Sequence, residues 1–247
     1  DGDAANEYGT TALMMAAQGG FNDEEGRPEI VQILLDAHAK VDLQDKEGWS
    51  ALIGAAKKGY SSVVDVLLRA GANVNLYNVS QESALWWASN YGNTDVVAKL
   101  IAVGACVEGA DVARTPLVAA AKNGYSDIVC LLIREGANVN VRGWNSALIG
   151  ASCHSYTDIV RMLIQAGADA TGDEGKWALK LVTNERHDET DRILHRPDGH
   201  FRRADIVRML IQAGADATGQ EGKQALRWAT ERHHGDVVAL LRQHGAH

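Results

Sequence analysis

Histidine is the residue type whose distribution in this chain most suggests chemistry, because seven of its nine copies follow residue 186. Three of them lie among aspartates in one segment: His187, Asp188, Asp191, His195, Asp198 and His200. Zinc takes both residue types as ligands, but this spacing matches no known zinc site. The adjacent His233 and His234 point to different faces of any regular element. We interpret these histidines as structural or solvated, and we predict no metal site and no cofactor.

The motifs that catalysis most often uses are absent from the sequence. It has no GxxxxGK[ST] phosphate loop, no GxSxG elbow, no HExxH helix and no GxGxxG after a strand. Serine, histidine and aspartate all occur, but nothing singles out a nucleophile together with its base. We therefore expect that the chain is not an enzyme and has no catalytic residues.

The three cysteines, Cys106, Cys130 and Cys153, are an odd number and form no CxxC pair. This argues against a disulfide framework and against a zinc site. Cys130 falls inside an apolar helical pattern, where we expect a small buried side chain. The cysteine usage favours a reducing compartment, so we expect an intracellular, cytoplasmic protein. No stretch approaches the roughly 18 apolar residues that span a bilayer, which predicts no membrane insertion.

The net charge of −8 is unevenly distributed along the chain. Residues 1–50 contain 11 acidic and 3 basic residues, which gives −8, and the remaining residues sum to zero. A nucleic-acid binder usually has a basic face, and no such concentration exists here. We therefore expect neither a nucleic acid nor a small molecule as the partner. The acidic end has two interpretations: a solvated face, or a surface that steers a basic partner.

One apolar pattern, Ile-Val-x-Ile-Leu-Leu in its first copy, recurs seven times and predicts a row of short helices. Its copies begin at residues 30, 63, 96, 128, 159, 206 and 237. Five steps are 31–33 residues and one step is 47, and a period in this range is typical of a repeat protein. Each of these helices except the first is followed by glycine, which accepts the left-handed backbone that ends a helix. These glycines are Gly71, Gly104, Gly136, Gly167, Gly214 and Gly245.

Each repeat also contains a second apolar segment, marked by Leu13, Leu52, Leu85, Leu117, Leu148, Leu179 and Leu226. In the first five repeats a hydroxyl residue stands two positions earlier: Thr11, Ser50, Ser83, Thr115 and Ser146. A hydroxyl there caps a helix by accepting a hydrogen bond from a free backbone N–H. Pro116 suits the first helical position because it needs no N–H partner. The leucine-marked segment precedes the Ile-Val pattern in each repeat. Each repeat is therefore predicted to consist of a short first helix at the marker leucine and a second helix at the Ile-Val pattern.

The order Thr-Pro-Leu, Ala-Ala, Gly-aromatic, Ile-Val-x-x-Leu-Leu and Gly-Ala-Asn-Val-Asn resembles the ankyrin repeat. The resemblance covers roughly residues 2–247 and is closest at 48–79 and 113–142. It implies an all-α ankyrin-repeat solenoid of about seven helix-turn-helix repeats joined by short β-hairpin or turn loops. A single domain over 1–247 would hold repeats at about 9–47, 48–80, 81–112, 113–143, 144–174, 175–221 and 222–247.

Two segments interrupt this regular pattern. The polar stretch 22–28 separates the two helices of the first repeat and is predicted to be a surface insertion. Residues 158–172 recur letter for letter at 205–219, which indicates an internal duplication, natural or engineered. Between these copies we predict that residues 185–203 form an irregular insertion, an extra helical turn plus a loop beside the stack.

The resemblance implies a non-catalytic protein–protein interaction module, a scaffold or adaptor, that presents a concave groove to a protein partner. In the family, hairpin tips and outward positions of the first helices build this groove. The matching positions are Lys46, Glu47, Trp49, Lys57, Lys58, Tyr77, Val79, Glu82, Asn90, Tyr91, Arg114, Lys122, Asn123, Arg142, Trp144, Asn145 and His154. Trp49, Tyr77, Tyr91 and Trp144 are the expected anchors, because tryptophan and tyrosine often dominate binding energy. The basic residues among them would set the charge preference.

Other interpretations stay open at this point. One alternative is a regulatory ligand- or nucleotide-sensing array of a larger enzyme or channel, and another is a structural spacer from a longer repeat array. A nucleotide would need a localised basic pocket, and only Lys57-Lys58 and Arg202-Arg203 offer paired cations. Some aromatic residues are also expected to pack rather than bind: at least one of Trp86 and Trp87, together with Tyr60, Tyr125 and Tyr156.

Overall fold

The computed structural model describes residues 3–19, 27–110, 114–141, 146–183 and 199–247, with side chains from residue 203 onward in the last range. The chain divides into two compact units. The first unit comprises Asp1–Ala120 and Arg134–Ala137, and the second comprises Ala121–Ile133 and Asn138–His247.

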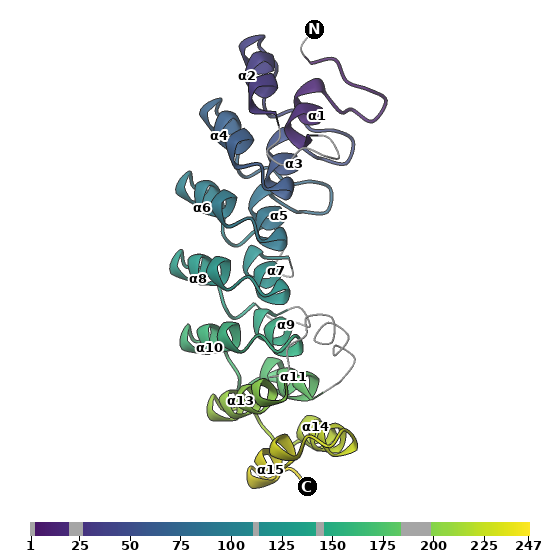
Figure 1. Cartoon of the computed structure of the whole chain (residues 1–247), viewed down its shortest axis with the longest axis vertical. Coiled ribbons are helices and arrows are strands. Elements are labelled where there is room, and N and C mark those ends of the chain that lie inside the picture. Colours follow the sequence, from purple (N-terminus) through teal and green to yellow (C-terminus); the bar gives the residue numbers. More distant parts are fainter. Residues whose placement is uncertain (1–2, 20–26, 111–113, 142–145, 184–198) are drawn as a thin grey trace. The chain divides into compact units, whose positions relative to one another are not determined.

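The first unit contains two rows of short helices (Figure 1). First helices form one row: α1 (Ala12–Gln18), α3 (Ala51–Lys58) and α5 (Ala84–Tyr91). Second helices form the other: α2 (Pro28–Asp36), α4 (Ser61–Arg69) and α6 (Thr94–Ala102). Each helix packs on its partner in the same repeat, as α3 does on α4, and on the same helix of the next repeat. Every helix is therefore held by its neighbours, which short helices need because they are marginal alone in water.

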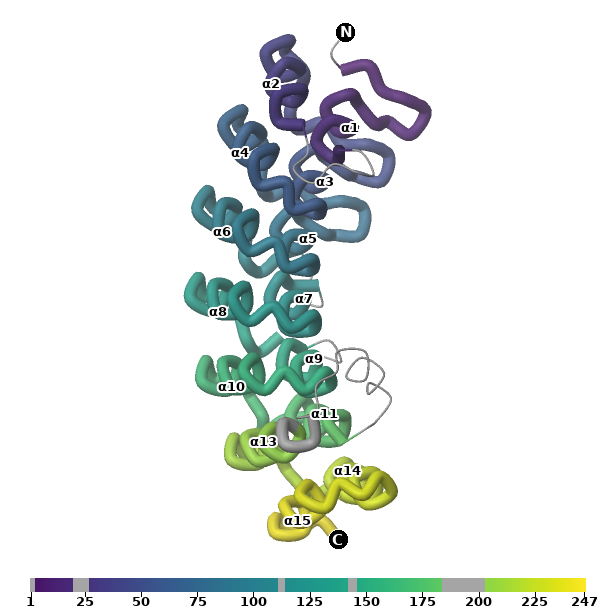
Figure 2. Tube along the Cα trace, viewed as in Figure 1, coloured from purple at the N-terminus to yellow at the C-terminus, as the bar shows by residue number. Residues whose placement is uncertain are grey.

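The second unit continues this alternation. The division between the two units falls within α7 (Pro116–Asn123) and before the last residue of α8 (Ser126–Arg134). They are followed by α9 (Ala147–Cys153), α10 (Thr157–Gln165), α11 (Asp173–Val182), α13 (Gly199–Gln212), α14 (Gln220–Glu231) and α15 (Gly235–Gln243). Figure 2 shows α14 and α15 paired, and α11 packs on both α9 and α14.

The fold class predicted from the repeat is confirmed. The described residues form fourteen helices in which first and second helices alternate along the chain, an all-α repeat solenoid. The expected hairpins are present only as isolated bridges within the described ranges, between Ala5 and Thr11 and between Tyr77 and Ser83.

The leucine and hydroxyl positions explain why the first helices form where they do. The marker leucines are buried in all seven repeats. The five hydroxyl caps accept hydrogen bonds from the backbone N–H three residues later, at 3.2–3.4 Å. Pro116 is the first residue of α7, as predicted. Tyr60 is buried, and Tyr125 and Tyr156 are half-buried, which agrees with a packing role.

Cys130 is a correction to the sequence-based expectation, because its side chain is exposed rather than buried. It occupies the variable position of the Ile-Val-x stripe, between the buried Val129 and Leu132. Other second helices carry Gln32 and Arg161 at this position, and both are exposed. The position therefore turns away from the neighbouring helices.

The two irregular segments fall largely outside the described residues. Of the insertion predicted over 185–203, residues 185–198 lie outside this description, and residues 199–203 belong to α13. In the first repeat, residues 20–26 likewise lie outside it, and α2 begins at Pro28.

Two residues after each second helix the backbone adopts the left-handed conformation, and the first repeat differs from the others in the residue type found there. Gly71 has φ +81° there, and a Cβ atom would meet nothing within 4 Å. In the first repeat His38 takes this position at φ +64°. A side chain in the left-handed region costs free energy that glycine avoids.

We expect His38→Gly to stabilise the first repeat by about 0.5–1 kcal/mol, less than the backbone strain alone because glycine also loses more chain entropy on folding. Hydrogen exchange of α2 would measure the gain. Gly71→Ala should have the opposite sign, since its only cost is backbone conformation. Faster exchange of α2 in His38→Gly would contradict this explanation.

Candidate functional site

The described side chains of the first unit include an aromatic cluster centred on Trp87 in α5. The ring centroid of Trp87 lies 5.0 Å from that of Trp49, 4.9 Å from that of Trp86 and 5.7 Å from that of Tyr91. Trp86 meets Trp87 edge-on, whereas Tyr91 stacks on it. Offset and edge-to-face pairs are the favourable arrangements for aromatic rings. The cluster therefore holds large aromatic surfaces in fixed positions.

A lysine completes this cluster. The Nζ atom of Lys57 in α3 lies 4.4 Å from the ring centroid of Trp87 and 4.8 Å from that of Trp49. A cation over the face of tryptophan is attracted by the ring quadrupole, by about 0.5–2 kcal/mol per contact. The ammonium group is thus fixed beside two indoles. We term Trp49, Lys57, Trp87 and Tyr91 the Trp87 cluster.

The repeat explains how Lys57 reaches this place. Lys57 lies at the end of a first helix, and the side chain at this position extends toward the first helix of the next repeat. In the same way the Gln18 side chain of α1 lies against Gly54 of α3. In α5 the residue equivalent to Gly54 is Trp87, so the same leaning side chain meets an indole. The fourth and fifth repeats carry Ala119 and Gly150 at this position of the first helix, and the last two carry Leu181 and Trp228.

The cluster is partly accessible to solvent. Tyr91 is 49% exposed, and Trp49, Lys57 and Trp87 are half-buried. The other predicted groove residues of the first unit are also exposed or half-buried: Lys46, Glu47, Lys58, Val79 and Asn90. Within the first unit, the helix ends and hairpins therefore present aromatic rings together with three lysines.

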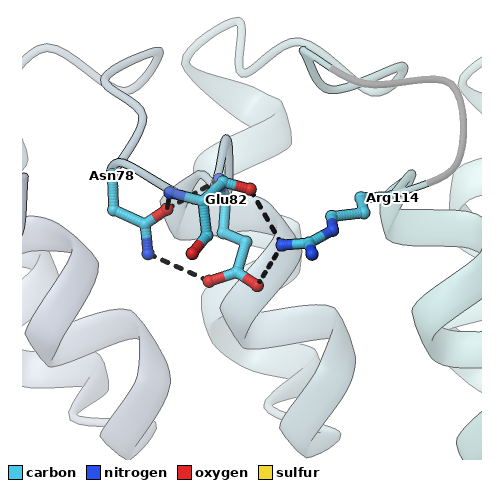
Figure 3. Close-up of polar contacts among 4 residues, drawn as sticks. Asn78, Glu82 and Arg114 are labelled. Atoms are coloured by element: carbon cyan, nitrogen blue, oxygen red, sulfur yellow. Dashed lines mark hydrogen bonds and ion pairs between the residues drawn. The ribbon is translucent and has the colours of Figure 1, made fainter.

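Arg114 and Glu82, predicted to bind a partner, are bound to each other (Figure 3). The Arg114 guanidinium donates to the Glu82 carboxylate at 3.2 Å and to the backbone carbonyl of Ser80 at 3.0 Å. Asn78 Oδ1 accepts from the backbone N–H groups of Ser80 and Glu82 at 3.0 and 2.9 Å, and Asn78 Nδ2 donates to Glu82 at 2.9 Å. This network closes the hairpin and leaves Arg114 and Glu82 with little unpaired charge.

Tyr77 and Glu47 contribute mainly through their backbones. The Gln44 side chain donates to the Tyr77 carbonyl at 2.9 Å, and Val79 N–H donates to the Glu47 carbonyl at 2.9 Å. Burial raises the pKa of the Tyr77 hydroxyl, and a contact with Cys106 adds to the increase. Tyr77 is therefore a packed residue of the hairpin rather than a free anchor.

In the second unit the predicted residues form a smaller set. Lys122 and Asn123 are exposed at the end of α7, and Lys122 leans over Gly150. His154 Nδ1 is 3.0 Å from the carbonyl oxygen of Gly150, and its ring stacks on Tyr156 at 5.7 Å. Arg142, Trp144 and Asn145 lie outside the described residues.

Trp87, the centre of the cluster, was not predicted from the sequence as a site residue and was considered only as a packing residue. A signal was present, because the equivalent positions in α3 and α7 hold Gly54 and Ala119. The repeats on either side of α5 therefore use small residues where α5 has an indole. Its Nε1 atom is buried and has no hydrogen-bond acceptor among the described residues, which costs free energy.

The described residues contain no group of three or more histidine, cysteine, aspartate or glutamate side chains placed to hold a metal ion. The candidate ligands His187, His195 and His200 lie outside the described side chains.

The cysteines differ in the ease with which they should react. Cys106 and Cys130 are exposed, whereas burial raises the pKa of the Cys153 thiol to about 11 despite the nearby Lys122 ammonium. Since the thiolate is the reactive form, Cys153 stays almost fully protonated until the pH approaches 11. We expect an aryl disulfide reagent at pH 8 to modify two thiols rapidly and the third at least about tenfold more slowly. Three equal rates, or retention of the slow phase in Cys153→Ser, would contradict this.

The paired helices, hydroxyl caps and terminal glycines define a helical repeat protein. A family model described as "Ankyrin repeats (3 copies)" matches residues 13–111 and 85–174, which together span more than half of the chain. The chain belongs to the ankyrin-repeat family. Ankyrin repeats are generally protein–protein interaction modules and typically non-catalytic.

Among solved structures, the chain is similar to one titled "Crystal structure of human ASB11 ankyrin repeat domain". The TM-score is 0.75 at 21% sequence identity, over 94% of this chain and 98% of that chain. At this identity the likeness shows the fold. No curated protein matches the sequence. Among the described residues, no helix combines the length and the apolar character needed to cross a membrane.

Proposed function

We propose that this chain is a non-catalytic protein-interaction module whose first unit binds a partner's loop or extended peptide at the Trp87 cluster. Trp49 and Tyr91 are the apolar anchors, Trp87 supports them from beneath, and Lys57 supplies a fixed cation. The partner and the complex belong to the intracellular compartment expected from the cysteines.

Trp87 is the observation that carries this proposal. It places an indole where α3 and α7 use Gly54 and Ala119, and it leaves a buried N–H group without an acceptor among the described residues. Both features set Trp87 apart from the equivalent residues of the two neighbouring repeats, and the unsatisfied N–H group costs free energy. They are understandable if the indole supports a binding surface, because rigid aromatic rings present large contact area with few torsions to freeze.

The charged residues around the cluster differ in whether their charge is available to a partner. Lys46 and Lys58 are exposed, and Lys57 is held over two rings. Arg114 is neutralised by Glu82, so we assign it to the hairpin rather than to the partner. We propose Lys122, Asn123 and His154 as a separate set of contacts made by the second unit, with Arg142, Trp144 and Asn145 retained as candidates.

Affinity capture from lysate of the source cell would test the proposal. We expect the wild-type chain to retain a partner that the Trp49→Ala/Tyr91→Ala variant loses, with unchanged circular dichroism. Equal capture by both would contradict the surface assignment. A panel of nucleotides in a thermal-shift assay separates the alternatives: a shift supports ligand sensing, and neither capture nor shift supports a spacer.

A further inference from the structure

The second unit contains a lysine that lies beside two indoles. The Lys180 Nζ atom of α11 is 4.4 Å from the ring centroid of Trp177 in the same helix and 5.6 Å from that of Trp228 in α14. The helices α11 and α14 pack on each other, so the ammonium group contacts indoles of two successive repeats. A cation over the face of tryptophan is attracted by the ring quadrupole. We term Trp177, Lys180 and Trp228 the Lys180 cluster.

The first unit uses the same arrangement at its own aromatic cluster. Trp228 takes the position in α14 that Trp87 takes in α5, two residues after the marker leucine. In both places a lysine from the first helix of the preceding repeat lies over the indole, Lys57 in α3 and Lys180 in α11. Two separate pairs of repeats therefore hold a lysine ammonium against an indole at the same repeat position.

Lys180 differs from the cations near it in sequence because no carboxylate of the described residues pairs with it. Lys176, one turn earlier in α11, pairs with Asp173 at 3.5 Å. Arg227 in α14 pairs with Glu231 at 2.8 Å. The contacts of Lys180 are instead with the two rings. The rings leave its charge intact, so its ammonium group can still pair with an anion.

The surroundings of the Lys180 cluster suit an anion. Trp177, Lys180 and Trp228 are all half-buried, so each keeps part of its surface accessible. A half-buried ammonium group is less screened by water, and it attracts an anion more strongly than a fully exposed lysine does. The net charge does not oppose such binding, because residues 1–50 carry −8 and residues 51–247 sum to zero.

We propose that the Lys180 cluster binds an acidic segment of a protein, in which a glutamate or aspartate stands next to apolar residues. The carboxylate pairs with the Lys180 ammonium group, and the apolar side chains lie on the accessible parts of the two indoles. Hydrogen bonds between an ammonium group and a carboxylate are roughly twice as strong as neutral ones. Tryptophan adds a large contact area with few torsions to freeze. This site lies in the second unit and does not depend on the Trp87 cluster.

The test uses fluorescein-labelled peptides of equal length in which leucine alternates with glutamate, glutamine or lysine. In fluorescence anisotropy with the whole chain, the glutamate peptide should bind at least about tenfold more tightly than the glutamine peptide, and the lysine peptide should not bind. Lys180→Gln should reduce the affinity for the glutamate peptide to that for the glutamine peptide. Lys180→Arg should retain binding, because a guanidinium keeps the charge and stacks on aromatic rings. Added salt should weaken the glutamate peptide only.

Lys223→Gln is the matched control, since Lys223 is an exposed lysine of α14 outside the cluster. It should bind the glutamate peptide like the wild type, and circular dichroism should show that all variants are folded. Absence of binding, or equal affinities for the wild type and Lys180→Gln, would overturn the proposal. Binding that Lys57→Gln removes and Lys180→Gln leaves unchanged would also overturn it, by placing the acidic segment at the Trp87 cluster.

Discussion

Replacing Gly222 by alanine is expected to unfold the last repeat under conditions in which the wild-type chain is folded. Gly222 is buried near the start of α14, and an added Cβ atom would overlap the backbone carbonyl oxygen of Ala217. A backbone atom cannot move aside as the end of a flexible side chain can. We expect a loss of about 3 kcal/mol or more, at the upper end of overpacking effects.

The internal duplication supplies a second copy of this experiment. Gly175 in α11 has the same contact with the carbonyl of Ala170, so Gly175→Ala should be similarly destabilising. Gly235→Ala, at the start of α15 with nothing within 4 Å, is the control and should cost nothing. Urea denaturation followed by circular dichroism measures all three. A Gly222→Ala variant as stable as Gly235→Ala would contradict a close contact between Gly222 and the backbone of Ala217.

Trp87→Ala should have the second largest effect. The indole contacts Trp49, Trp86 and Tyr91 and lies beneath the Lys57 ammonium, so its loss removes one side of each contact. We expect the first unit to lose about 2–4 kcal/mol, somewhat less than a fully buried tryptophan, and partner binding to fall with it. Tryptophan fluorescence should also shift to longer wavelength as the remaining rings become hydrated.

Met15→Ala is the matched control for this prediction, because Met15 takes the position of Trp87 in α1 and is exposed. We expect it to change stability by less than about 0.5 kcal/mol, as surface substitutions usually do. If Trp87→Ala and Met15→Ala had equal stability, the aromatic cluster would not contribute to the fold.

The sequence was sufficient to predict the fold because its evidence is periodic and local. Hydroxyl caps such as Ser50 and the paired marker leucines act within one turn of the chain, so their spacing alone places the helices. Cys130 was predictable too, since the stripe itself puts its position on the outward side. Treating the apolar run as uniformly buried caused that error.

The site was less predictable because it depends on which side chains meet across repeats. The pairing of Arg114 with Glu82 joins residues 32 apart, and no local pattern indicates that the two neutralise each other. Trp87 lies at the centre of the cluster because Trp49 and Lys57 of the preceding repeat approach it. Similarly, Ile30 and Val63 look equivalent in sequence, and only the neighbouring helices decide which one is buried.

We propose above that the Trp87 cluster binds the protein partner. Its most direct test is the partner's dissociation constant, measured by calorimetry, for the wild type, Tyr91→Ala and Tyr8→Ala. Tyr8 is an equally suitable exposed tyrosine of the first unit outside the cluster, at 65% exposure. We predict at least about 30-fold weaker binding for Tyr91→Ala, a hot-spot loss of about 2 kcal/mol, and no change for Tyr8→Ala. Equal affinities for Tyr91→Ala and the wild type would contradict the claim.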